Sequence, residues 1–231
     1  MIAAELLESP SNLRPINLAA VQNVLVFDGL QRPTRFGQFY RNRTAVFIFL
    51  RNFLDYTTVD YARDWVKVIS FLKERNIALV PIGCAPCKYV REFEQLTALQ
   101  PVYTDPERIT YTNLELTTKA NYSSPAKRTS AHVHTNMLTG ILQGTLRAMR
   151  SMEFQGNPHQ NGGALIINSD SSVVFCHREQ NPFDQAQVKD ILEALSIDLT
   201  DFVEWTRKKR TQCKTHFITP VRTCGSVVQF V

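Results

Sequence analysis

Two cysteines that lie three positions apart are the first candidates for chemistry. In the stretch "IALVPIGCAPCKYVREF" (residues 77–93), Cys84 and Cys87 follow the pattern of a buried strand and precede the pattern of a helix. A helix start supplies partial positive charge, which lowers the pKa of a nearby thiol, and this spacing permits an internal disulfide. The sequence therefore offers a candidate catalytic dithiol for thiol–disulfide exchange, with Cys84 as the exposed nucleophile and Cys87 as the resolving thiol.

Two other interpretations of this pair stay open. Cysteine is among the most buried residue types and packs like a small hydrophobe, so both thiols can be inert. The pair could also bind a metal if Cys213, His216 and Cys224 fold back onto it, but the spacing of these three residues is not that of a zinc motif. We therefore predict neither a metal nor a cofactor, and the accessibility of Cys84 decides between redox chemistry and packing.

The composition argues against several classes of protein. Five cysteines, an odd number spread over 231 residues, do not make the disulfide framework of a small secreted domain. A formal net charge of +5 is too small to indicate nucleic-acid binding without a clustered patch. No apolar run approaches the roughly 20 residues of a membrane helix, and the N-terminal sequence does not resemble a secretory signal. We expect a cytoplasmic protein whose partner is a thiol reductant or another protein, with no nucleic acid and no membrane.

Apolar runs alternate with helical periodicity along most of the chain. Buried strands are predicted at Val21–Phe27, Thr44–Leu50 and Ile77–Gly83, and "GALIINSDSSVVFCHRE" predicts a β-hairpin. Pro81 inside the third strand removes a backbone donor, which indicates a sheet edge or a bulge. Helices are predicted within residues 56–76, with Thr57 or Thr58 as cap, and at Tyr89–Leu99, Thr135–Met152 and Asp184–Leu195. This order predicts an α/β fold with a mixed β-sheet that is flanked by helices on both faces.

We predict that the chain divides into three parts. Residues 1–20 form an N-terminal extension, residues 21–199 form the single domain, and residues 200–231 form a basic C-terminal tail. The tail contains the run Arg207–Arg210, which is either a solvated surface or a signal for nuclear import or for an acidic partner.

Four segments together resemble the peroxiredoxin-like 2 family, in particular its C subgroup. They are "FIFLRNFLDY", "YTDPERITY", "FQGNPHQNGGALII" and "HREQN", and the resemblance runs from about Val24 to about Leu199 and includes the last few residues. These are antioxidant-domain proteins of the alkyl hydroperoxide reductase and thiol-specific antioxidant type. The resemblance implies a thioredoxin-like fold and an antioxidant-type function.

The chain departs from the family pattern where the family dithiol is expected. Close members carry Arg, His, Phe, Leu, Cys, Tyr, x, Cys where this chain reads "RNFLDYTT" (residues 51–58), so the two family cysteines fall on Asp55 and Thr58. Peroxiredoxins also use an arginine near the later hairpin, where this chain reads Asn161-Gly162-Gly163. A carboxylate and a hydroxyl cannot form a redox couple, so we expect a degenerate family site without peroxide reduction.

The resemblance also relates this lost dithiol to the cysteine pair. In a thioredoxin-like fold, Thr44–Leu50 and Ile77–Gly83 are parallel neighbours, so Asp55 and Cys84 should lie at the same edge of the sheet. Two functions remain open: an antioxidant-type protein with thiol–disulfide exchange at Cys84 and Cys87, or a catalytically inert pseudo-enzyme that acts as a protein-binding or regulatory module.

Overall fold

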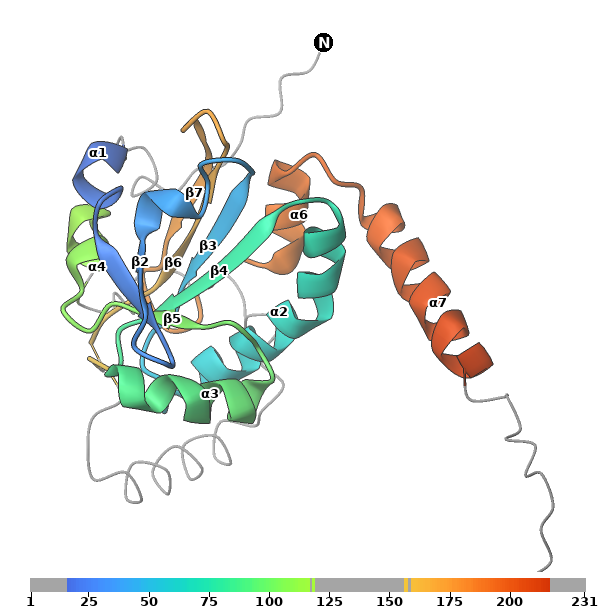
Figure 1. The fold of residues 1–231 in the computed structure, drawn as a ribbon, viewed down its shortest axis with the longest axis horizontal. Coiled ribbons are helices and arrows are strands. Elements are labelled where there is room, and N and C mark those ends of the chain that lie inside the picture. The colour runs from blue at the N-terminus through green and yellow to red at the C-terminus, as the bar shows by residue number, and fades with distance from the viewer. Residues whose placement is uncertain (1–15, 117, 119–155, 158, 217–231) are drawn as a thin grey trace, which may run out of the picture.

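The computed structural model describes residues 16–116, 118, 156–157 and 159–216 (Figure 1). Its strands form one mixed sheet in the order β2-β1-β5-β4-β3-β6-β7. The strands are β1 (Leu25–Asp28), β2 (Pro33–Arg35), β3 (Ala45–Phe49), β4 (Ala78–Gly83), β5 (Tyr103–Thr104), β6 (Gly163–Ile167) and β7 (Val173–Arg178).

Helices cover both faces of this sheet, as predicted. The helices are α1 (Leu18–Val21), η2 (Phe36–Gln38), α2 (Tyr56–Glu74), η3 (Cys87–Tyr89), α3 (Val90–Thr97), α4 (Ile109–Asn113), α6 (Val188–Ala194) and α7 (Leu199–His216). Side chains alternate along β3, so Val46 and Ile48 join one apolar cluster with α2, α3 and α6. Phe47 and Phe49 point to the other face and pack with residues of α1, η2 and α4.

The central strands bring four chain segments to one edge of the sheet. β3 and β4 are parallel and in register from Ala45↔Ala78 to Phe49↔Ile82. β6 runs antiparallel to β3 with Phe49 opposite Gly163, and β7 runs antiparallel to β6. The carboxyl ends of β3 and β4 therefore meet the beginning of β6 and the end of β7.

The prediction of a strand over Val21–Phe27 is wrong at its beginning. Val21 ends the short helix α1, and β1 starts only at Leu25. The side chain of Asn17 accepts a hydrogen bond from the Ala20 amide and caps α1, while Val21 is fully buried. A local cap therefore outweighs the strand preference of the β-branched residue.

The expectation of an edge or a bulge at Pro81 is also wrong, because β4 lies inside the sheet. The Ala78 amide donates to the Thr44 carbonyl, and the Ile82 carbonyl accepts from Leu50, so these residues direct their backbone polar groups toward β3. Strand alternation then turns Pro81 toward β5, whose ladder with β4 begins only at Ile82. The missing N–H of Pro81 therefore interrupts no ladder hydrogen bond.

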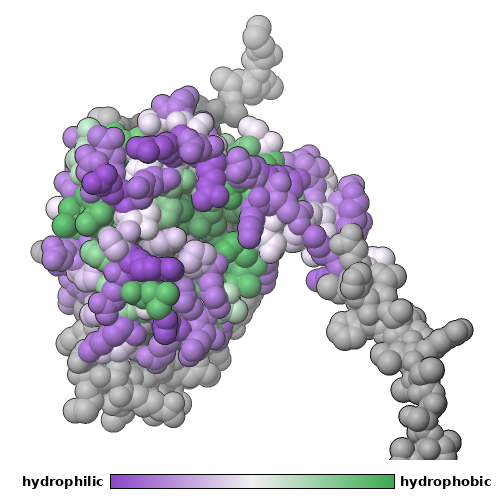
Figure 2. Space-filling model, in the orientation of Figure 1, coloured by the Kyte–Doolittle hydropathy of each residue, from purple (hydrophilic) through white to green (hydrophobic). Residues whose placement is uncertain are grey.

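The helix α7 packs on α2 through residues between Phe202 and Lys209. Phe71 of α2 contacts the rings of Phe202 and Trp205, with centroid distances of 5.1 and 5.5 Å. The ammonium group of Lys209 lies 2.9 Å from a carboxylate oxygen of Glu74. The second half of α7 extends away from the rest of the domain (Figure 1), and the described part of the helix is mostly hydrophilic (Figure 2).

Several predictions lie outside what the structure describes. These are the helix Thr135–Met152 and nearly all of the loop predicted over 117–134. The domain boundaries at residues 20 and 199 stay predictions. Among the described residues, no helix combines the length and the apolar character needed to span a membrane.

Candidate functional site

Asp55 begins helix α2 at the carboxyl edge of the sheet. It is the N-cap residue, and its carboxylate accepts hydrogen bonds from the amide and the hydroxyl of Thr57, at 3.1 and 2.9 Å. The prediction of Thr57 or Thr58 as the cap is wrong, because the carboxylate of Asp55 already accepts from the first-turn amide. Thr58 is the third residue of the helix and is 1% exposed, and its hydroxyl has no hydrogen-bond partner among the described residues.

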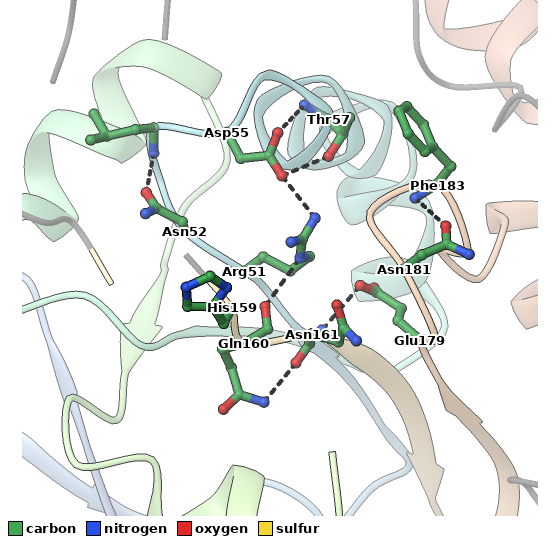
Figure 3. Close-up of polar contacts among 12 residues, drawn as sticks. Arg51, Asn52, Asp55, Thr57, His159, Gln160, Asn161, Glu179, Asn181 and Phe183 are labelled. Atoms are coloured by element: carbon green, nitrogen blue, oxygen red, sulfur yellow. Dashed lines mark hydrogen bonds and ion pairs between the residues drawn. The ribbon is translucent and has the colours of Figure 1, made fainter. Parts of the chain in front are cut away.

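Arg51 fixes this carboxylate from the loop that follows β3. One guanidinium nitrogen lies 3.0 Å from Asp55 Oδ2, and the Nε–H group donates to the Gln160 carbonyl at 3.1 Å (Figure 3). The Arg51 side chain is 7% exposed, whereas that of Asp55 is 21% exposed. A buried cation therefore joins the start of α2 to the segment that leads into β6.

Glu179 is a second carboxyl group at the same edge, directly after β7. It is 1% exposed, and its Oε2 accepts a hydrogen bond from the Gly162 amide at 3.0 Å. Burial raises the pKa of Glu179 to about 8, although the charges of Arg51 and His177 act in the opposite direction. A Cβ atom on Gly162 would lie 2.0 Å from the Phe49 carbonyl oxygen, so the close strand approach requires glycine.

His177 adds a further titratable group beside Glu179. Its Nε2 lies 2.6 Å from the Asp184 carbonyl oxygen and 3.5 Å from the carboxylate oxygen of the same residue. Burial by itself lowers the pKa of His177, but the hydrogen bonds and charge of Asp184 outweigh burial, and the net direction is upward.

Cys84 follows β4 and is buried against apolar side chains. It is 4% exposed and belongs to the cluster that contains Phe49 and Tyr111. A Cβ atom on Gly156 would lie 3.0 Å from the thiol sulfur, so this segment covers the thiol closely. Burial raises the pKa of Cys84, and the backbone hydrogen bond from Asn157 offsets only part of this effect.

The prediction that Cys84 is an exposed nucleophile at a helix start, with a lowered pKa, is therefore wrong. The helical segment begins with η3 at Cys87, and Pro86 is its N-cap residue, so Cys84 lies outside the helix. Cys87 is half-buried, and burial raises its pKa as well. The charge of Arg108 lowers the pKa of Cys84, but burial outweighs it, so the pKa of each thiol lies above its ordinary value and the thiolate is disfavoured.

The predicted relation between Asp55 and Cys84 is confirmed. Both follow neighbouring parallel strands, and both lie at the carboxyl edge. The hydroxyl of Tyr111 joins the ends of these strands, since it donates toward the carbonyl oxygens of Leu50 and Ile82 at 2.7 and 2.8 Å.

The structure gives limited information on the metal interpretation. No group of three or more potential metal ligands occurs among the described histidine, cysteine, aspartate and glutamate side chains. The side chains of Cys213, His216 and Cys224 lie outside the described residues. Cys84, Cys87 and Cys176 are free thiols.

Three residues of this edge were missed in the sequence: Arg51, Gln160 and Glu179. Arg51 carried the clearest signal, because a charged residue directly after a fully apolar strand, four residues before Asp55, can pair with it. Gln160 and Glu179 lie within segments that resemble the family, but their contacts with Arg51 and Gly162 span 109 and 17 residues. Local pattern alone does not reveal such contacts.

Comparison with known proteins identifies the family. The family model described as "AhpC/TSA antioxidant enzyme" matches residues 66–181, which include Cys84, Cys87 and Glu179 but begin after Asp55 and Thr58. Peroxiredoxin-like 2C of Bos taurus is 33% identical over 197 residues, which cover 84% of this chain and 85% of the relative. Peroxiredoxin-like 2C of Homo sapiens is 33% identical over 207 residues, which cover 87% and 90%.

Solved structures agree on the fold. A cysteine-to-serine mutant of PrxQ from Xylella fastidiosa matches with a TM-score of 0.54 at 11% identity, over 82% of this chain and 98% of that chain. Peroxidoxin BcpB from Mycobacterium tuberculosis matches with a TM-score of 0.50 at 11% identity, over 75% and 89%. At this identity the structures show the thioredoxin-like peroxiredoxin fold, while the sequence relatives establish that the chain belongs to the peroxiredoxin-like 2 family, within its C subgroup.

Proposed function

We propose that this chain is an antioxidant-family protein that has lost the family dithiol at the start of α2 and acts as a protein-binding or regulatory module. The observation that carries the proposal is the position of Asp55 at the N-cap of α2, paired with Arg51. A carboxylate there satisfies the helix start and the buried cation, but it cannot pass electrons to a peroxide. The Thr58 hydroxyl, in the first turn, cannot resolve a sulfenic acid.

The burial of Cys84 supports the same proposal. Thiolate is the reactive form of cysteine, and a thiol that is 4% exposed and has a raised pKa is protonated at neutral pH. The expected partner is a protein, and the expected compartment is the cytoplasm.

Peroxide consumption with dithiothreitol as reductant tests this proposal. We expect no turnover by the unchanged chain beyond the rate of a matched chain with Cys84→Ser and Cys87→Ser. The double variant Asp55→Cys, Thr58→Cys should acquire a titratable dithiol at α2, because the helix start keeps its position. Robust turnover by the unchanged chain that persists after Cys84 and Cys87 are replaced would refute the proposal.

A second candidate is thiol–disulfide exchange at Cys84 and Cys87. It is favoured by the half-buried Cys87, the first residue of η3, the short helix that directly precedes α3. The thiolate of Cys87 would attack a substrate disulfide and expel one substrate thiol, and Cys84 would then displace the other as the Cys84–Cys87 disulfide forms. Two electrons pass to the substrate, which becomes two thiols, and a thiol reductant would restore the pair.

Exposure to oxidised glutathione, followed by iodoacetamide trapping and peptide mass spectrometry, separates the two candidates. The exchange candidate requires a Cys84–Cys87 disulfide in the folded chain, and Cys176→Ser serves as the matched control that leaves this disulfide intact. If both thiols stay reduced until the protein is unfolded, the exchange candidate fails and the binding module remains.

A further inference from the structure

The excess positive charge of the chain lies in its last residues, which include the second half of helix α7. The chain has 26 basic and 21 acidic residues, and six of the basic ones but none of the acidic ones lie within residues 205–231. The formal net charge of +5 is therefore concentrated in this segment, and the rest of the chain is nearly neutral. The segment contains four consecutive cations, Arg207, Lys208, Lys209 and Arg210, all on α7.

Contacts with α2 hold this helix in place and occupy only one of the four cations. The rings of Phe202 and Trp205 pack on Phe71. The Lys209 ammonium group lies 2.9 Å from one carboxylate oxygen of Glu74, and the Trp205 indole N–H donates to the other oxygen at 2.5 Å. The charge of Lys209 is therefore already balanced within the chain, and this side chain is directed toward α2.

The other three cations are exposed and have no counter-charge within the described part of the chain. The side chains of Arg207, Lys208 and Arg210 form no ion pair with a described residue, and Glu204, one turn before Lys208, is not paired with them. Like charges one turn apart, as at Arg207 and Arg210, destabilise a helix. The helix dipole favours cations only in the last turn, and α7 continues to His216. An anionic partner would therefore remove a repulsion that the chain itself leaves uncompensated.

We propose that Arg207, Lys208 and Arg210 form a docking surface for a partner protein, which binds through a short segment rich in aspartate and glutamate. The inference rests on the proposed protein-binding function and names the class of its partner. The three side chains are exposed on a helix that extends away from the domain, so a partner reaches them without any change in the sheet (Figure 1). Arginine forms paired hydrogen bonds with carboxylate groups, which suits two of the three residues to this role.

The composition of α7 favours an acidic protein over other polyanions. A helix that binds a membrane surface needs an apolar face, but Phe202 and Trp205 pack against α2, and Val203 is the exposed large apolar side chain of the described part of α7. Tight binding of nucleic acid relies on many phosphate contacts and on aromatic rings that stack with bases. The two rings of α7 are occupied by Phe71, and Glu204 would repel a phosphate backbone that continued along the helix. A short acidic segment needs only the three cations.

Fluorescence anisotropy with a labelled oligoglutamate peptide tests the proposal on the full chain. We expect binding at low ionic strength that weakens as salt is added. The single variants Arg207→Gln, Lys208→Gln and Arg210→Gln should each weaken binding about threefold, which is the effect of losing one exposed ion pair. The double variant Glu74→Gln, Lys209→Gln removes a cation together with its partner, so it should bind the peptide as the unchanged chain does. Circular dichroism checks that all variants keep their helix content.

The matched control is Lys67→Gln, which makes the same change at an exposed cation of α2 that is paired with Asp64. It should leave the affinity for the peptide unchanged. The proposal is overturned if the peptide does not bind, or if Lys67→Gln or the double variant weakens binding as much as Arg207→Gln does. Tighter binding of single-stranded RNA of equal charge, or of vesicles that contain phosphatidylserine, would overturn the choice of an acidic protein. Because the readout is peptide affinity, its failure is distinguishable from a failure of the proposed function, which is measured by peroxide turnover.

Discussion

The two loops at the carboxyl edge leave neighbouring parallel strands, but their side chains differ in kind. The loop after β3 places Arg51 and Asp55 in an ion pair that starts a helix of 19 residues. The loop after β4 places Cys84 in an apolar cluster and reaches its helical turn only at Cys87. The first loop combines a buried cation with a helix start but carries no thiol. The second loop carries two thiols, and burial raises the pKa of both.

This difference teaches that a position at the functional edge of a sheet is not sufficient for thiol chemistry. A thiol needs a nearby positive charge or a helix start to become a thiolate, and burial in apolar surroundings acts against ionisation. At the first loop the positive charge of Arg51 and the start of α2 stabilise the carboxylate of Asp55 instead of a thiolate. At the second loop burial raises the pKa of both thiols.

The largest loss of stability from a single substitution should come from removing the buried cation of the first loop. Arg51→Met leaves Asp55 and the Gln160 carbonyl without their partner, so we expect a loss of about 3 kcal/mol in the free energy of unfolding. Lys67→Met is the matched control, because Lys67 forms an exposed ion pair with Asp64 and should cost less than about 1 kcal/mol. Urea unfolding of both variants measures the difference, and equal losses would show that the Arg51 pair is an ordinary surface pair.

The second effect is a change in the pH dependence of stability. The pKa of Glu179 rises from 4.5 to about 8 in the folded chain, so the folded state binds one more proton than the unfolded state between these values. Stability from this group is complete at low pH and is lost as pH rises through this window, by up to about 1.4 kcal/mol per pH unit. Glu179→Gln removes this loss, so the variant should gain stability relative to the unchanged chain as pH rises toward 8.

Thermal unfolding of both proteins across this pH window tests the expectation. His177 is present in both, so its own titration contributes to both curves. Parallel curves for the two proteins would contradict a protonated Glu179 in the folded state.

A smaller effect should separate the two thiols of the second loop. Cys84→Ala opens a small cavity in the apolar cluster and should cost about 1 kcal/mol. Cys87→Ala changes a half-buried position and should cost less than about 0.5 kcal/mol. Iodoacetamide should also label Cys87 before Cys84 in the folded protein. Faster labelling of Cys84 would remove the contrast between the two loops.

The smallest effect concerns two neighbouring threonines in the first turn of α2. Thr57→Val loses the hydroxyl that donates to Asp55, so it should cost about 1 kcal/mol. Thr58→Val removes a buried hydroxyl that has no partner among the described residues, so it should raise stability by roughly 0.5 kcal/mol. Equilibrium unfolding of the two variants should therefore give changes of opposite sign, and a destabilised Thr58→Val would indicate a partner for that hydroxyl.

Much of the fold could be predicted from local sequence. The strands β3 and β4 can be recognised without a structure, because a strand buried on both faces is a continuous apolar run. The helix α2 can be recognised as well, because burial of one face places apolar residues at helical spacing. Val21 and Pro81 were misassigned, because a cap on α1 and the late start of the β5 ladder depend on context. Strand pairing decides whether a missing N–H matters, and a single sequence does not specify the pairing in detail.

The candidate site was less accessible to prediction. The common edge of Asp55 and Cys84 follows from the order of the elements, so it could be inferred. The burial of Cys84 depends on contacts with Gly156 and Asn157, which are more than 70 residues away in the chain. The raised pKa of Glu179 likewise depends on burial that arises only when β3, β6 and β7 come together.

The Tyr111 hydroxyl has a consequence for how this edge can evolve. It binds the backbone carbonyl groups of Leu50, directly after β3, and of Ile82, near the end of β4, so the anchor does not depend on which side chains the two loops carry. Substitutions of side chains at the start of α2 therefore leave this anchor between the two strands in place.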